Sequence, residues 1–85
     1  MELKECRNKL DAIDSEILSL FFERMEVVQK VAEYKKENGL PVLAAAREKE
    51  ILERVRDKSG ELAPYAQTLF ETLLYVSREY QKTLL

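Results

Sequence analysis

The chain has 85 residues with a formal net charge of −2, 46% hydrophobic and 35% charged residues, one cysteine and no histidine. This composition is that of an ordinary soluble globular protein, and the length allows one domain, residues 1–85, with a small core. The weak negative charge disfavours a nucleic-acid-binding module, the absence of histidine disfavours a metal site, and no apolar run approaches the ~20 residues of a membrane helix, so we expect a cytoplasmic protein.

Local signals in the sequence predict an all-α fold of three helices. Asn38-Gly39 supplies a left-handed cap that should end a long first helix, and Pro41 prevents its continuation. Ser59-Gly60 should end the second helix, and Pro64 suits the first turn of the third. The three helices are expected over residues 2–37, from 43 or 44 to 59, and 64–84. The apolar face of the third helix is expected to comprise Leu69, Phe70, Leu73, Leu74 and Val76.

Apolar residues recur at spacings of three and four along the first helix, which is the pattern of one helix face. Arg24 occupies one position of this stripe, and the apolar pattern resumes after it. A buried guanidinium without a partner is costly, so Arg24 should meet either a polar group of another helix or a bound anion. We expect Cys6 to be a small buried hydrophobe. The apolar stripe consists of Leu3, Cys6, Leu10, Ile13, Ile17, Leu20, Val27, Val31 and Tyr34.

The first helix would be ~54 Å long, which is too long for two shorter helices to cover. We therefore expect an intertwined helical homodimer in which the long helices of two chains pack together and the shorter helices wrap across them. The alternative is a monomeric helical hairpin whose first helix frays.

Further polar residues lie near the face of Arg24. Lys35 follows eleven residues later and points within about 20° of Arg24. Arg7 is turned by about 100°, and it could converge with Arg24 if a partner chain supplied it. Each has a simpler interpretation, because Lys35 could complement the helix dipole and Arg7 could bond to Asp11.

Polar positions also interrupt the apolar faces of the other two helices. Ser77 and Gln81 lie four residues apart on the third helix, while Arg47 and Glu48 open the second, where a solvated face is the simpler interpretation. Together with the cations of the first helix, these groups suit a compact ligand that carries more than one carboxylate and a hydroxyl group.

The order and spacing of several segments resemble those of the all-helical (type II) chorismate mutase family. The resemblance implies intertwined dimers of three-helix chains, and an isomerase that rearranges chorismate to prephenate in the phenylalanine and tyrosine branch of the shikimate pathway. It implies no cofactor and no metal. The segments that carry it are residues 7–14, 23–24, 31–35, 41–42, 47–52 and 77–81.

The resemblance also implies a role for each candidate site residue. Lys35, Gln81 and Arg24 would be the catalytic set, with Lys35 and Gln81 at the ether oxygen, and with Arg24 and again Lys35 at a carboxylate. Arg7 from the partner chain and Ser77 would contact carboxylates of the substrate. Arg47 and Glu48 would lie near the ring hydroxyl, and Glu48 would accept the hydrogen bond that this hydroxyl donates.

One position departs from the family pattern, because Ala44 stands where an acidic residue is usual. This leaves recognition of the hydroxyl to Glu48. Two alternatives to the mutase stay open. The first is an isochorismate-pyruvate lyase on the same scaffold, which Ala44 favours and Glu48 disfavours. The second is a noncatalytic helical dimerisation module in which Arg24 and Lys35 pair with acids of the second or third helix.

Overall fold

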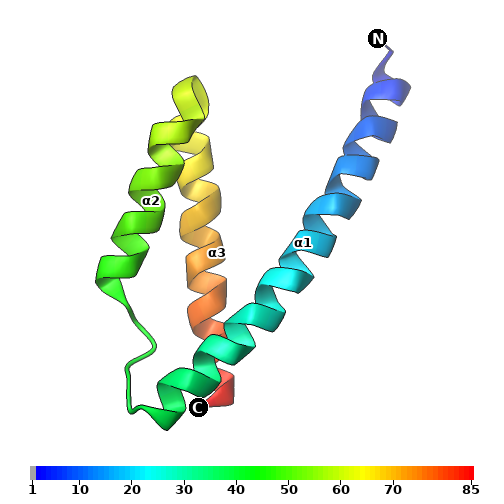
Figure 1. Cartoon of the computed structure of the whole chain (residues 1–85). Coiled ribbons are helices and arrows are strands. Elements are labelled where there is room, and N and C mark those ends of the chain that lie inside the picture. Colours follow the sequence, from blue (N-terminus) through cyan, green and yellow to red (C-terminus); the bar gives the residue numbers. More distant parts are fainter. Residues whose placement is uncertain (1) are drawn as a thin grey trace.

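The computed structural model describes residues 2–85, and nearly all of them are helical (Figure 1). The predicted all-α class and the three predicted α-helices are confirmed, and the described residues contain no strand. The second and third helices are joined by a single 3-10 turn, so the helical residues form two uninterrupted stretches. The elements are α1 (Leu3–Glu37), α2 (Ala45–Ser59), η1 (Gly60–Leu62) and α3 (Ala63–Leu84).

The end of α1 has the predicted left-handed cap. Gly39 has a φ of 64°, which glycine adopts without steric cost. The amide of Leu40 donates to the carbonyl of Lys35 over 2.8 Å, and the amide of Gly39 donates to the carbonyl of Lys36 over 3.4 Å. These two bonds form a Schellman motif, which satisfies carbonyls that the helix end leaves free.

The hairpin of α2 and α3 is set by its own local signals. Helix α2 begins at Ala45, slightly later than predicted, and its N-cap Ala44 makes no side-chain hydrogen bond. Gly60 has a φ of 54° where the chain reverses. Pro64 lies in the first turn of α3, where its missing N–H leaves no hydrogen bond unmade. The two helices therefore run antiparallel, side by side (Figure 1).

Helix α3 contacts both α2 and α1, but only the carboxyl-terminal part of α1 meets it (Figure 1). The amino-terminal part of α1 extends away from the hairpin, and the longest dimension of the chain is 53 Å. Within the described range, the buried apolar residues are Val28, Ala32 and Leu74. A core this small buries little of the apolar surface that the sequence offers.

Most of the apolar stripe on α1 is exposed within one chain. Leu20 is 63% exposed and Ile17 57% exposed. Two expectations about burial are wrong for the isolated chain, because Cys6 is only half-buried and Leu69 is 56% exposed. Cys6 belongs to the amino-terminal part of α1, which extends away from the hairpin (Figure 1).

No helix within residues 2–85 combines the length and apolar character that crossing a membrane requires.

Candidate functional site

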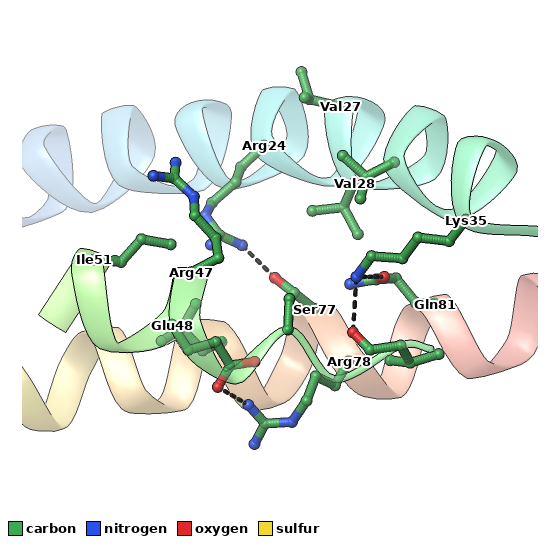
Figure 2. A pocket seen from close by; sticks show the side chains of 14 residues that line it. Arg24, Val27, Val28, Lys35, Arg47, Glu48, Ile51, Ser77, Arg78 and Gln81 are labelled. Atoms are coloured by element: carbon green, nitrogen blue, oxygen red, sulfur yellow. Dashed lines mark hydrogen bonds and ion pairs between the residues drawn. The ribbon is translucent and has the colours of Figure 1, made fainter. Parts of the chain in front are cut away.

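A cavity of about 260 Å³ lies where α1 passes over the hairpin of α2 and α3 (Figure 2). Its apolar wall includes Val28 and Val31 of α1, Ile51 of α2 and Leu74 of α3. Polar side chains from all three helices also line it, and these determine what it can bind.

Arg24 reaches across this cavity from α1 and donates a hydrogen bond to the hydroxyl of Ser77 on α3 (Figure 2). Ser77 is only 5% exposed, and its Oγ donates in turn to the carbonyl of Leu73 over 2.8 Å. This second bond fixes the hydroxyl so that its lone pairs face the guanidinium. Burial lowers the pKa of the Arg24 guanidinium, because desolvation disfavours the charged form.

Lys35 lies further along the same face of α1, as its spacing from Arg24 predicts. Its Nζ donates to the side-chain Oε1 of Gln81 over 2.9 Å and to the backbone carbonyl of Val42 over 2.7 Å. Gln81 is only 6% exposed. Since its Oε1 accepts from Lys35, its Nε2 remains a hydrogen-bond donor.

The noncatalytic alternative required Arg24 and Lys35 to pair with acids of the second or third helix. The ion pairs found within residues 2–85 involve other cations, and the partners of Arg24 and Lys35 are neutral oxygens. The observed contacts therefore contradict the pairing that this alternative predicts, and two positive charges stand without a carboxylate partner in this part of the chain.

The two residues that open α2 have different surroundings. Arg47 lies at an exposed edge of the cavity and forms an ion pair with Glu50. Glu48 is half-buried, lines the cavity and forms an ion pair with Arg78 of α3 (Figure 2). Ala44 lines the same cavity, so the position that departs from the pattern belongs to the site.

Sequence reasoning missed Val28 of the apolar wall and two polar contributors to the cavity. The Arg78 side chain lines it, although its neighbour Ser77 already occupies the inward stripe of α3. The carbonyl of Val42 comes from the connection between α1 and α2, where no sequence signal marks a backbone acceptor.

Arg7 is not brought to the cavity by its own chain. It is exposed and precedes Arg24 by 24 − 7 = 17 residues, which corresponds to ~26 Å along α1. Within one chain the cavity thus unites Arg24, Lys35, Arg47, Glu48, Ser77 and Gln81 and leaves Arg7 apart.

Residues 6–82 match the protein family described as chorismate mutase type II. The chain belongs to this family. The match covers the whole cavity and most of α1, so the polar groups described above lie on a chorismate mutase type II scaffold.

Curated relatives carry consistent names. A bifunctional chorismate mutase/prephenate dehydratase of Aquifex aeolicus (strain VF5) is 35% identical over 82 residues, which cover 92% of this chain and 21% of that protein. A chorismate mutase of Methanocaldococcus jannaschii is 44% identical over 55 residues, covering 65% of this chain and 56% of that protein. A T-protein of Haemophilus influenzae is 36% identical over 72 residues, or 85% of this chain and 19% of that protein. The chain thus spans between 19% and 56% of the length of these relatives.

The chemistry of this type II site follows from its charges. Two cations with neutral partners attract a ligand that carries more than one negative charge. Apolar walls lower the local dielectric constant, which strengthens that attraction. No cluster of potential metal ligands is found within residues 2–85. The polar side chains that line the cavity are charged and neutral hydrogen-bond donors together with one carboxylate.

Proposed function

We propose that the chain is a chorismate mutase, an isomerase that rearranges chorismate to prephenate in phenylalanine and tyrosine biosynthesis. The observation that carries the proposal is the contact between Lys35 and Gln81, which sets two donors side by side in a cavity that Arg24 also enters. Membership of the chorismate mutase type II family supplies the substrate class.

The reaction is pericyclic: the ether carbon–oxygen bond breaks while a carbon–carbon bond forms within the same molecule. It needs no nucleophile and no proton transfer. Catalysis comes from holding the enolpyruvyl side chain folded over the ring and from stabilising the negative charge that develops on the ether oxygen. We assign the second role to Lys35 Nζ and Gln81 Nε2, which donate from neighbouring positions.

The remaining side chains bind the substrate in this proposal. Arg24 and Ser77 hold one carboxylate, and Lys35 adds a second contact to it. Arg47 and Glu48 lie near the ring hydroxyl, with Glu48 as acceptor. Because Arg7 is remote within its own chain, its role in holding the other carboxylate requires a second copy of the protein.

We propose that this second copy belongs to a homodimer, in which residues 1–85 form one domain per chain. The exposed apolar stripe of α1 supports it, because monomeric soluble proteins rarely leave a contiguous apolar surface of this extent uncovered. Pairing two such stripes would bury a shared core and place the amino-terminal part of one α1 near the cavity of the other chain. The cytoplasm is the proposed compartment, on the composition already described.

The decisive test is the loss of chorismate ultraviolet absorbance on addition of purified protein, with prephenate measured as product. Prephenate formation is the expected result. Release of salicylate from isochorismate instead would indicate the lyase. No turnover of either substrate, together with no thermal stabilisation by a bicyclic dicarboxylate mimic of the transition state, would indicate the noncatalytic module.

A further inference from the structure

Glu48 is the one carboxylate among the side chains that line the cavity. Its position is unfavourable on charge alone, because the proposed substrate carries two carboxylates and like charges repel strongly in a partly desolvated site. Arg78 forms an ion pair with it from the neighbouring helix α3 and lines the same cavity (Figure 2). The Arg78 side chain is 28% exposed and that of Glu48 is 20% exposed, so solvent screens this pair less than a surface pair.

The geometry of the pair leaves part of the carboxylate available. The guanidinium of Arg78 donates to Oε1 of Glu48, and no hydrogen bond within residues 2–85 reaches the other oxygen, Oε2. An ionised carboxylate accepts at both oxygens, so Oε2 can accept a hydrogen bond from a ligand hydroxyl while Oε1 stays with Arg78. Ala44 lines the same cavity, and its side chain has no acceptor to share this task.

We infer that Arg78 is a positioning residue that orients Glu48 towards the substrate hydroxyl and cancels its charge, and so sets specificity for a hydroxylated ring. The inference rests on the proposed mutase function. It adds a residue that acts through Glu48, not through contact with the substrate. Without Arg78, Glu48 would be free to turn, and it would repel the dianion that Arg24 and Lys35 attract.

The test compares Arg78→Gln with Lys82→Gln, which removes another cation of α3 from an exposed pair with Glu79 outside the cavity. Two quantities are measured: kcat/KM for chorismate, and the ratio of this value to that for an analogue without the ring hydroxyl. We expect Arg78→Gln to lower kcat/KM by about 10- to 100-fold, mainly through KM, and to bring the ratio close to one. Lys82→Gln should change neither quantity by more than about twofold.

A second pair of variants separates positioning from direct contact. In a Glu48→Gln background, adding Arg78→Gln should lower kcat/KM for chorismate by less than about threefold, because the carboxylate that pairs with Arg78 is already gone. Circular dichroism and thermal unfolding establish that each variant is folded. If Arg78→Gln does not fold, Arg78→Lys replaces it: this variant keeps the charge but loses the planar fork, so the hydroxyl ratio should fall by an intermediate amount.

Three results would overturn the inference. The first is a folded Arg78→Gln whose kcat/KM equals that of Lys82→Gln. The second is an equal loss of kcat/KM from Arg78→Gln in the wild-type and Glu48→Gln backgrounds. The third is an unchanged ratio of kcat/KM between chorismate and the analogue without the hydroxyl, in Arg78→Gln or, where that variant does not fold, in Arg78→Lys. A wild-type protein that does not convert chorismate would instead refute the proposed function, so the two failures are distinguishable.

Discussion

Arg24 and Lys35 carry positive charge into a partly buried cavity, where their protein partners are a hydroxyl, an amide oxygen and a backbone carbonyl. Neutral partners fix the direction of each cation without cancelling its charge. The free protein bears the cost of desolvating these groups, and an anionic ligand recovers it. Such preorganisation favours binding at some expense of stability.

Lys35→Ala tests the proposed catalytic donor. Loss of a preorganised donor at developing negative charge should lower kcat by about 10²- to 10³-fold, or roughly 3 to 4 kcal/mol. The free energy of unfolding should change far less, because Lys35 is half-buried and makes no ion pair in the described chain. Turnover and thermal melting are compared with Lys36→Ala, an exposed neighbour. Near-normal turnover in Lys35→Ala would contradict the assignment.

Arg24→Met tests the cost of the desolvated guanidinium. Burial lowers the pKa of Arg24, so the unfolded chain binds this proton more tightly than the folded protein. Stability linked to this group therefore rises with pH only through the alkaline interval between the folded and unfolded pKa values, and at neutral pH the full cost remains.

We expect Arg24→Met to be as stable as wild type, or more stable by up to about 1 kcal/mol after allowance for solvent screening, in the absence of ligand. Binding of the bicyclic dicarboxylate should be lost. Chemical denaturation at pH 7 and calorimetric titration measure the two effects. A less stable variant that still binds the mimic would show that Arg24 has a structural role.

At the scale of elements, the helix boundaries could be predicted because their signals are local. Gly39 and Gly60 allow the positive φ of a chain reversal, whereas Pro41 and Pro64 restrict the backbone, and the observed helices end or begin close to these four residues. The match of Lys35 with Arg24 on one face was also predictable, since it depends only on the helical repeat.

Contacts between helices were harder to predict. The pair formed by Arg78 and Glu48 depends on the position of α3 relative to α2 along their axes, which the 3-10 turn and the packing of both helices determine together. The bond from Lys35 to Val42 depends on the path of a connection that has no periodic pattern. Neither the relative axial position of two helices nor the path of a loop is encoded in a short stretch of sequence.

Gly39→Ala tests whether this connection holds Lys35 in place. No atom lies within 4 Å of the added Cβ, so the cost is the left-handed backbone alone, about 1 kcal/mol. We expect the free energy of unfolding, measured with denaturant, to fall by this amount and kcat to fall several-fold. The reason is that the amide of Leu40 donates to the Lys35 carbonyl, and the Lys35 Nζ donates to the Val42 carbonyl. Gly60→Ala, which also has an open Cβ position and a positive φ, is the control. It should lose at least as much stability with unchanged kcat, and equal kcat losses in both variants would contradict this coupling.

At the scale of the whole molecule, the proposed homodimer accounts for both the exposed stripe on α1 and the remote position of Arg7. The described part of the chain, residues 2–85, is 53 Å long and has three buried apolar residues, which is too small a core to explain its long helix. If a second copy covers the stripe, the same contact brings a second Arg7 towards the cavity. Stability and activity would then both depend on protein concentration.

Mixing two inactive variants tests this shared site. In the proposed homodimer, Arg7→Ala and Lys35→Ala should each disable both sites. A heterodimer has one intact site, in which the chain with normal Lys35 receives Arg7 from the other chain, and one site with both defects. Random reassortment after joint denaturation and refolding makes about half of the dimers heterodimers, so about a quarter of wild-type activity should return. Each variant refolded alone is the control, and differential tags verify that heterodimers form. Heterodimers that recover no activity would show that Arg7 does not act across the interface, whereas a site built within one chain would leave Arg7→Ala active by itself.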